Sequence, residues 1–336
     1  MVRLRRSSPD TPGWTRRRAG KGFVYLDQDG ERLGPGDVAR VKGLVIPPAW
    51  QDVWICSWPN GHLQAVGTDD AGRRQYLYHP DWRVRRDGEK FRRMLVFGKA
   101  LSKAREQVLV DLGAASMTQE RACAVAVRLL DLRYFRIGNE EYAEENTSFG
   151  LTTLERRHVR RDGKALVFEF TGKSGIEHTI TIDDAGAVEA LEVMRRRRGG
   201  DDRLLAWKDG RRWRPVDSAL VNEYVGLTTG MEATAKDFRT WHATVLMAVA
   251  LAVSREVADS PGKRRRAVAR AYHEVAEYLG NTPAVARASY VDPRIVDLYD
   301  GGSTVLRALE QAGSDGGEGP FLHGAVERAV LRLLST

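Results

Sequence analysis

The sequence contains few cysteines and none of the common metal or nucleotide motifs. Cys56 and Cys123 are the only two cysteines among 336 residues, and they lie too far apart to form a C-x-x-C pair. A disulfide framework and a thiolate zinc site are both disfavoured, so we expect two buried, reduced thiols. No H-E-x-x-H, G-x-x-x-x-G-K-[ST] or D-x-D-x-D-G spacing is present. We therefore expect neither a metal ion nor a nucleotide cofactor.

Long hydrophobic runs are also missing. No apolar segment reaches the roughly 18 residues that span a bilayer, and residues 1–20 lack the apolar stretch of a secretory signal. The hydrophobic fraction of 42% is ordinary for a soluble globular protein. These observations predict a cytoplasmic protein with no membrane partner.

The net charge of +8 is concentrated at the start of the chain. Residues 1–21 contain six Arg and one Lys against one Asp, a net of +6, which leaves about +2 for all other residues. A positive chain suits a polyanionic partner, but a basic run is more often a solvated face. The runs at 195–198 and 262–272 therefore leave nucleic-acid contact open.

The periodicity divides the chain into three parts and predicts an α+β fold. Residues 1–20 are basic and aperiodic and predict a disordered arm. Residues 21–88 contain short alternating runs such as "HLQAVGTD" and "RRQYLYH", which predict a small antiparallel sheet with one short helix. Residues 89–336 follow the helical period, interrupted by a three-stranded meander with Lys173 on a hairpin tip.

The segment "NTPAVARASYVDP" predicts a helix of about two turns between two proline-marked helix starts. Thr282 is the expected N-cap, Asn281 stands just before it, and Tyr290 closes the last turn beside Ala288 and Ser289. A tyrosine in such a place usually packs between helices with its hydroxyl bonded to a carbonyl. Taken alone, the segment favours that structural role.

Two arginines occupy positions that need an anionic partner. Gly138 predicts a helix stop that would place Arg136 in a last turn. There its guanidinium can bind a phosphate or form a salt bridge to Glu140, Glu141 or Glu145. Arg239 stands near the start of an apolar helix and needs a bound anion or a carboxylate such as Asp237. The local sequence leaves both alternatives open.

A strand of aromatic residues is a further candidate. In "GRRQYLYH", Tyr76 and Tyr78 share one strand face with Arg74, while Gln75 points oppositely or lies at the edge. Such a face can grip a nucleic-acid backbone, and half-buried packing explains it equally well. By contrast, Lys173 in "TGKSG" is a turn lysine, which normally only aids solubility.

Five segments, in order from about residue 21 to residue 300, resemble the type IB DNA topoisomerases, specifically the small poxvirus-like enzymes of bacteria. They are "GRRQYLYH", "FRIGNEEYAEENTSFGLTTL", "FTGKSG", "KDFRTWHAT" and "LGNTPAVARASYVDPRI". Each segment alone is weak evidence for this resemblance, whereas five segments in the same order are strong evidence. The resemblance implies a β-rich N-terminal domain and a mainly helical catalytic domain of the type IB topoisomerase and tyrosine recombinase kind, closing as a clamp around double-stranded DNA.

The resemblance also implies a reaction. One strand would be cut through a 3′-phosphotyrosyl link and resealed, which relaxes supercoils without ATP or a metal ion. Tyr290 would be the nucleophile. Arg136 and Arg239 would stabilise charge on the phosphate, and Lys173 would protonate the leaving 5′-oxygen. Asn281 would donate one more hydrogen bond to the phosphate.

Further family positions touch DNA, and they carry over to five residues of this chain. Those residues are Gln75, Tyr76 and Tyr78 in the N-terminal half, with Tyr142 and Lys236 beside the scissile phosphate. We expect a nucleoid-associated monomer. One departure concerns Asn281, because poxvirus and nuclear members have histidine there, although bacterial relatives also show asparagine. An amide cannot carry a proton between pH 5 and 8, so a general-acid role is excluded at this position.

Two alternatives from other functional classes remain. Tyrosine recombinases share the catalytic fold, but they usually have histidine where this sequence has Asp237, and they lack the "GRRQYLYH" sheet. A non-catalytic DNA-binding protein of the same fold would be favoured by the loss of any of the five catalytic side chains. All five are present.

Overall fold

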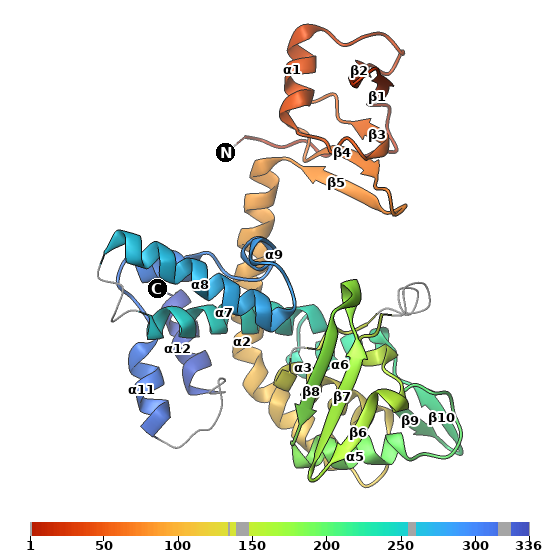
Figure 1. Ribbon diagram of the computed structural model, residues 1–336, viewed down its shortest axis with the longest axis vertical. Helices are drawn as coiled ribbons and strands as arrows, with labels where there is room; N and C mark the ends of the chain where they lie inside the picture. The colour runs from red at the N-terminus through yellow and green to blue at the C-terminus, as the bar shows by residue number, and fades with distance from the viewer. Residues whose placement is uncertain (1, 134, 139–147, 255–259, 315–323, 336) are drawn as a thin grey trace. The chain divides into compact units, whose positions relative to one another are not determined.

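The chain forms two compact units, Met1–Arg92 and Arg93–Thr336. The computed structural model describes residues 2–133, 135–138, 148–254, 260–314 and 324–335. The first unit is a small β-rich domain and the second is mainly helical, which confirms the predicted α+β fold (Figure 1). Within the described ranges, no helix is long and apolar enough to cross a bilayer.

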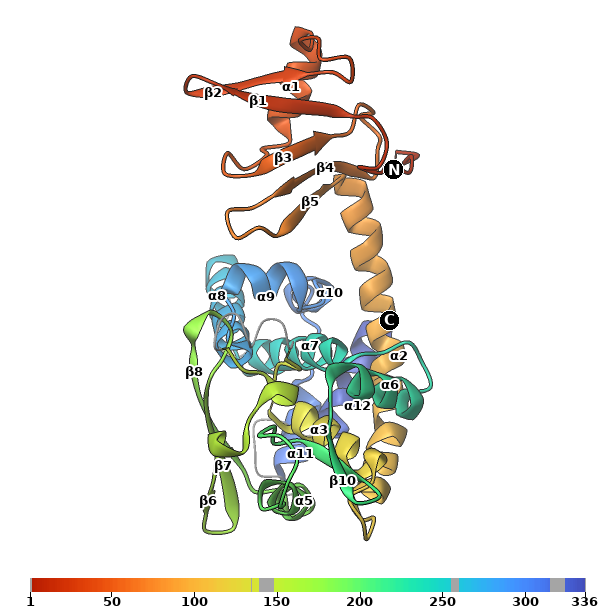
Figure 2. The same ribbon diagram turned by 90° about the vertical axis from the view of Figure 1, so that its right-hand side faces the viewer.

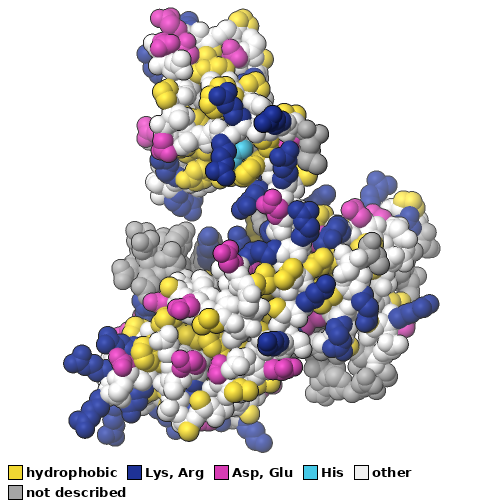
Figure 3. Space-filling model, turned by 180° about the vertical axis from the view of Figure 1, so that it is seen from behind, with side chains coloured by type: hydrophobic (Ala, Val, Ile, Leu, Met, Phe, Trp, Pro, Cys, Tyr) yellow, Lys and Arg dark blue, Asp and Glu magenta, His cyan; other side chains and the backbone are white. Residues whose placement is uncertain are grey.

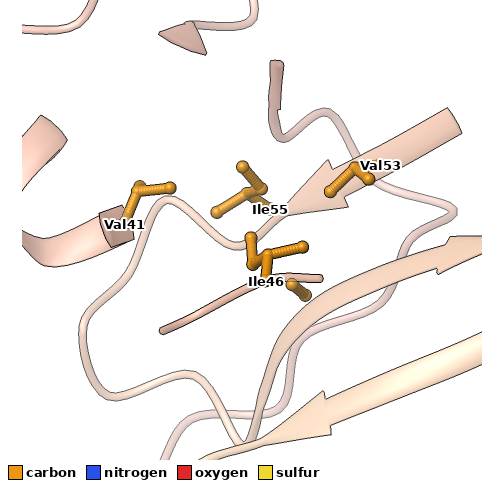
Figure 4. Packing of buried hydrophobic residues seen from close by; sticks show 5 residues of the cluster. Val41, Ile46, Val53 and Ile55 are labelled. Carbon is orange, nitrogen blue, oxygen red and sulfur yellow. The ribbon is translucent and has the colours of Figure 1, made fainter. Parts of the chain in front are cut away.

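The N-terminal unit is built on a five-stranded antiparallel sheet with the strand order β2-β1-β3-β4-β5 (Figure 2). Helix α1 (Pro35–Gly43) begins with proline in its first turn and packs Val41 against the sheet. The core consists of Val41, Ile46, Val53, Ile55 and Ala65 (Figure 4). The strands are β1 (Trp14–Ala19), β2 (Gly22–Leu26), β3 (Gln51–Ile55), β4 (Leu63–Thr68) and β5 (Arg74–Tyr78).

Disorder was predicted for residues 1–20, and this prediction is wrong for residues 14–19, which form strand β1 between β2 and β3. Arg16 shows why. Its guanidinium donates three hydrogen bonds to main-chain carbonyls of the 46–50 loop and lies 4.1 Å from the centre of the Phe23 ring. The basic composition suggested disorder, but Arg16 donates hydrogen bonds within the fold rather than serving as a solvated charge.

The C-terminal unit contains the predicted meander, a three-stranded antiparallel sheet of β6 (Val159–Asp162), β7 (Ala165–Thr171) and β8 (Glu177–Ile182). A second hairpin, β9 (Ala206–Asp209) and β10 (Arg212–Pro215), was not predicted, although "DG" at 209–210 is a hairpin turn signal. Helix α2 (Pro80–Leu112) begins in the first unit and ends in the second. The other helices of the second unit are α3 (Gln119–Arg133), α5 (Ala185–Arg195), α6 (Ser218–Thr229), α7 (Ala235–Val253), α8 (Pro261–Leu279), α9 (Pro283–Ser289), α10 (Arg294–Asp300), α11 (Leu306–Ser314) and α12 (Ala325–Ser335).

Helix α7 is held in place by a buried ionic network. Arg105 of α2 donates two hydrogen bonds to Asp131 of α3, at 2.8 and 2.9 Å. It also donates to Glu327 of α12, at 2.5 and 3.0 Å. Glu327 accepts from the Trp241 indole at 2.9 Å, and Asp131 lies 3.2 Å from Nε2 of His242. Since Trp241 and His242 belong to α7, the network joins four helices.

We expect Glu327→Ala to lower the free energy of unfolding by about 3 kcal/mol at pH 7, because the buried charge of Arg105 loses one of its carboxylate partners. Burial raises the pKa of Glu327, but the hydrogen bond and charge of Arg105 outweigh it and hold the pKa below its ordinary value. The carboxylate therefore stabilises the fold above the unfolded-state pKa of about 4.3. That contribution disappears as the pH falls through the lower folded-state pKa.

Urea denaturation at pH 7 and pH 3.5 measures this effect. The difference between wild type and Glu327→Ala should be large at pH 7 and smaller at pH 3.5. Glu310→Ala, which removes an exposed carboxylate of α11, is the matched control and should change little. Equal unfolding of Glu327→Ala and wild type at pH 7 would contradict the role of the network.

Candidate active site

Tyr290 follows the seven-residue helix α9 and occupies its C-cap, as the sequence predicts. Thr282 caps the start of this helix by accepting a backbone N–H. The main chain around the tyrosine is fixed from α7, because Oγ1 of Thr244 accepts from the Asp292 N–H at 3.1 Å and lies 3.4 Å from the Tyr290 carbonyl. The sequence reading missed this anchoring threonine. The tyrosine itself is half-buried, while Ala288 beside it is exposed.

Two arginines converge on the turn that precedes α9. Nη2 of Arg136 donates to the Gly280 carbonyl at 2.7 Å and to Oδ1 of Asn281 at 2.9 Å. Nη2 of Arg239 donates to the Leu279 carbonyl at 2.7 Å. Gly280 ends α8 with φ of 60°, a left-handed conformation that favours glycine. The turn brings both guanidinium groups to adjacent carbonyls.

Arg136 was predicted in the last turn of a helix, but α3 ends three residues earlier, at Arg133. The segment that follows α3 is held by the chain around Gly150. The Leu151 N–H donates to the Arg136 carbonyl at 2.8 Å. A Cβ atom on Gly150 would lie 2.4 Å from Cα of Gly138, so the two segments touch through glycine. The described residues do not include Tyr142. They also do not include the three glutamates considered as partners of Arg136, which are Glu140, Glu141 and Glu145.

Arg239 and Tyr290 interact directly. The guanidinium carbon lies 5.3 Å from the centre of the phenol ring, and Arg239 is only 6% exposed. Burial raises the pKa of Tyr290, but the charge of Arg239, a hydrogen bond from it, and the charges of Lys236 and Arg136 outweigh burial. The pKa of the phenol therefore lies below its ordinary value. For Arg239 the effects are opposite: burial lowers its pKa, and the interaction with Tyr290 raises it part of the way back.

The first turn of α7 gives Asp237 partners other than Arg239. Asp237 accepts from the Thr234 N–H at 2.8 Å, which caps the helix, and from Arg93 at 2.6 Å. Lys236 is exposed in the same turn, and its charge acts on Tyr290. Lys236 therefore lies close enough to the phenol to act on it, while its expected contact with DNA stays a prediction.

Asn281 presents a donor that the described residues leave unused. Its Oδ1 accepts from Arg136, whereas its Nδ2 is buried and has no hydrogen-bond partner in the described ranges. A buried polar group without a partner destabilises a protein by about 1–3 kcal/mol. A ligand oxygen placed beside this turn would satisfy the amide.

A pocket of about 390 Å³ lies between β8 and the end of α8. Its wall includes Arg136, Arg239, Gly280, Gly172 and His178. The sequence reading missed His178. The only local signal is the strand alternation in β8, which places this residue on the half-buried face a few residues after the Lys173 hairpin.

The His178 ring is stacked on Phe170, with ring centres 5.1 Å apart. Burial lowers the pKa of His178, and the positive charges of Arg136 and Arg239 lower it further. The imidazole is therefore expected to be neutral at pH 7.

Lys173 is exposed in the short turn Lys173–Gly175 that joins β7 to β8, as predicted. The register pairs Thr171 with Glu177 across the hairpin. Gly172 lines the pocket, so the main chain of Lys173, the next residue, lies at the edge of the pocket. Lys173, Arg136, Arg239, Asn281 and Tyr290 all belong to the C-terminal unit.

Strand β5 of the N-terminal unit carries the other predicted residues. Arg74, Tyr76 and Tyr78 are exposed on one face, and the two tyrosine rings are stacked with centres 6.3 Å apart. Gln75 is half-buried on the opposite side and donates to Asp69 at 2.8 Å. Tyr76 and Tyr78 therefore present an aromatic surface, whereas Gln75 is engaged within the unit.

Comparison with known proteins yields two family matches. Residues 79–300 match the family described as eukaryotic DNA topoisomerase I, catalytic core. Residues 22–69 match the family described as bacterial DNA topoisomerase IB, N-terminal domain. Together these matches cover both units.

Individual relatives agree with the family matches. The chain is 31% identical to DNA topoisomerase 1B of Acanthamoeba polyphaga mimivirus, over 85% of this chain and 87% of the viral protein. It is 20% identical to DNA topoisomerase 1B of Vaccinia virus (strain Copenhagen), over 69% of this chain and 71% of the viral protein. A stretch of 142 residues is 30% identical to DNA topoisomerase 1 of Schizosaccharomyces pombe, covering 40% of this chain and 16% of the yeast protein.

Proposed function

Because this chain belongs to the type IB DNA topoisomerase family, we propose that it relaxes supercoiled DNA by transient cleavage of one strand through a 3′-phosphotyrosyl link at Tyr290. The observation that carries the choice of residues is the convergence of Arg136 and Arg239 on the turn before Tyr290. The bond from phosphorus to the 5′-oxygen breaks as the bond to the phenolic oxygen forms. One phosphodiester replaces another, so the reaction needs no ATP.

The phenol needs help to act as a nucleophile. An ordinary tyrosine has a pKa of about 10 and is almost wholly protonated at pH 7. The field of Arg239, Lys236 and Arg136 lowers that pKa and favours the phenolate that attacks phosphorus. Thr244 limits movement of the main chain at this point, which keeps the oxygen aimed.

Three donors are available for the phosphate oxygens. Arg136 and Arg239 are held by main-chain carbonyls, and Nδ2 of Asn281, which has no partner among the described residues, would donate to a ligand oxygen. Donors that are already oriented stabilise developing negative charge without reorganising during the reaction. Asn281 contributes a hydrogen bond only, because an amide carries no proton at neutral pH.

Lys173 supplies the proton to the leaving 5′-oxygen in this proposal. We expect Lys173→Ala to slow cleavage of ordinary DNA by about 10²-fold, which is the low end for general-acid catalysis. In a substrate with sulfur in place of the bridging 5′-oxygen, the sulfur leaves without needing a proton. The variant should therefore cleave this substrate almost as fast as wild type. Single-turnover cleavage of both substrates measures the difference. Equal slowing on both would refute the proton-donor role.

His178 acts as a positioning residue between two loops. A Cβ atom on Gly172 would lie 2.6 Å from the imidazole, and one on Gly280 would lie 3.6 Å from its Cε1. Gly172 precedes Lys173, and Gly280 precedes Asn281. The ring therefore fills the space between the hairpin and the turn, and it sets the separation of two groups that act on the same phosphate.

We expect His178→Ala to slow cleavage by roughly 10- to 100-fold, since small displacements of catalytic groups have effects of that size. His178→Phe restores a ring of similar size and should recover most of the rate. Because a pKa below its ordinary value leaves the imidazole mainly neutral at pH 7 and above, His178→Phe should leave the pH–rate profile unchanged between pH 7 and 8. A phenylalanine variant as slow as the alanine variant, or one that loses a pH-dependent limb, would point to a chemical role for the imidazole instead.

DNA is the substrate in this proposal, and we propose that the protein acts as a nucleoid-associated monomer. Tyr76 and Tyr78 would contact the duplex from the N-terminal unit, while Lys236 and Tyr142 would act beside the scissile phosphate. Gln75 would have to exchange its bond with Asp69 for DNA. Lys and Arg side chains are spread over both units on the face shown in Figure 3, which suits a polyanion without defining one patch.

Supercoiled plasmid in EDTA, without ATP, tests the proposed function. The protein should relax supercoils of either sign, and denaturation during the reaction should trap protein linked to the 3′ end of one strand. A protein that shifts the plasmid in a gel but leaves it supercoiled would be a DNA-binding protein of the same fold. Joining of exchanged strands from two duplexes would indicate a recombinase.

A further inference from the structure

The N-terminal unit contains a second aromatic pocket, remote in sequence from the catalytic residues. Its volume is about 470 Å³, within the roughly 300–1,000 Å³ of small-molecule sites. The indole rings of Trp58 and Trp82 and the imidazole of His62 supply its aromatic wall. The N-terminal segment supplies the remaining lining residues, Arg6, Ser7, Ser8 and Thr11.

The N-terminal segment is a fixed wall of this pocket. Arg5 forms a β-bridge with Gly61, and its guanidinium carbon lies 3.5 Å from the centre of the Trp58 ring. Oγ of Ser7 donates to the Leu63 carbonyl at 2.9 Å. The predicted mobile arm is therefore ordered here as well, and it brings Arg6 to the aromatic side chains.

The His62 ring is oriented by the N-terminal segment. The Ser7 N–H donates to Nδ1 of His62 at 3.1 Å, so Nδ1 faces that segment. The imidazole meets the Trp82 ring edge-on, with centres 4.7 Å apart. The lining thus combines flat apolar surface with N–H and O–H groups and one cation.

The pocket continues the exposed aromatic surface of β5. Tyr76 stacks on Tyr78 at 6.3 Å, Tyr78 lies 6.4 Å from His62, and His62 reaches Trp82. These contacts form a continuous row from the strand proposed to face the duplex to the pocket. This continuity argues that the occupant is part of the same DNA.

We propose that this pocket binds one unpaired nucleotide of DNA, with its base stacked on the tryptophan rings and its phosphate at Arg6. Aromatic rings accept any base because every base has a π face, and a nearby cation suits the backbone. A base within a duplex is covered on both faces, and extruding it requires a few kcal/mol. The pocket therefore favours unpaired over paired DNA, and negatively supercoiled plasmids expose such nucleotides.

Binding is measured with full-length protein carrying Tyr290→Phe, so that cleavage does not interfere. Fluorescence anisotropy compares a labelled 12-nucleotide oligothymidine with a labelled 20-base-pair duplex at physiological salt. In this background, we expect Trp82→Ala to weaken binding of the oligothymidine about tenfold and that of the duplex less than twofold. Trp82→Phe, which keeps an aromatic ring, should retain most of the single-strand affinity.

Trp213→Ala is the matched control, because Trp213 lies on β10 in the other unit and should affect neither ligand. Circular dichroism and the melting temperature establish that Trp82→Ala is folded. Photocrosslinking of an iodouracil oligonucleotide should label Trp58 or Trp82. Unchanged oligothymidine binding by Trp82→Ala, equal weakening on the duplex, or crosslinks confined to residues 93–336 would overturn the proposal. None of these results depends on relaxation by Tyr290, so this site and the proposed function fail separately.

Discussion

Tyr290→Phe should abolish formation of the covalent protein–DNA adduct while leaving duplex binding within about twofold of wild type. The variant lacks only the phenolic oxygen, which is the sole atom of the side chain that can form the bond to phosphorus. Removing the nucleophile of an enzyme with a covalent intermediate lowers the rate by about 10⁶-fold. The ring remains, so its contact with Arg239 and the backbone anchoring by Thr244 should persist.

Adduct formation is measured on a duplex labelled on the cleaved strand, after denaturation with detergent. Tyr272→Phe is the matched control, because Tyr272 is a buried tyrosine of α8 and its hydroxyl has no assigned part in the reaction. It should form the adduct at the wild-type rate. Residual adduct in Tyr290→Phe would show that another residue attacks the phosphate and would remove the basis of the proposed mechanism.

Arg239→Gln should slow cleavage by about 10³-fold at pH 7, the upper end of the effect of removing one transition-state donor. Two losses act together in this variant. The phosphate loses a cationic donor, and the phenol loses the charge that most strongly opposes the effect of burial on its pKa. Glutamine is polar and uncharged but shorter than arginine, so the bond from Nη2 to the Leu279 carbonyl should be lost, and the melting temperature establishes that the variant is folded.

The pH dependence separates these two losses. Burial alone raises a phenol pKa, so the pKa of Tyr290 should rise when Arg239 is neutralised. If the phenolate is the reacting form, the rate increases with pH until the phenol pKa is reached. The increase should therefore extend to higher pH in Arg239→Gln than in wild type, and the rate deficit should shrink on the alkaline side.

Single-turnover cleavage between pH 6 and 10 measures this profile. Arg265→Ala removes an exposed arginine of α8 and serves as the control for general loss of positive charge. It should weaken binding slightly at low salt and leave the profile in place. A deficit in Arg239→Gln that stays constant across the pH range would show that the arginine acts on the phosphate alone.

Much of the local structure around the candidate site could be predicted from short-range signals. Thr282 and Pro283 predict the start of α9, and the spacing from there predicts that Tyr290 closes the helix. The turn residues around Lys173 predict a hairpin tip, because hairpin chemistry is local in the chain. The family resemblance was also correct, since its motifs are contiguous segments.

Other features depend on contacts between distant segments and left little local trace. The composition of residues 14–19 suggests disorder, but the segment forms a strand. Arg16 donates to three main-chain carbonyls that lie 30 to 34 residues further along the chain. Arg136 lies beyond the end of α3 at Arg133, and its carbonyl accepts from the Leu151 N–H, a contact that the local sequence does not reveal. His178 has no motif of its own, and only the packing of two glycine-containing loops places it in the pocket.

The sequence by itself determined the family and predicted many of the structural elements and the candidate reactive side chains, because capping, turn chemistry and motif order are written in neighbouring residues. Only the tertiary structure decided what surrounds those side chains. The carbonyls that hold Arg136 and Arg239, the unused amide of Asn281 and the lowered pKa of Tyr290 all arise where α7, β8 and the end of α8 meet. Charge and burial depend on distances through space, and residues more than 140 positions apart set those distances here.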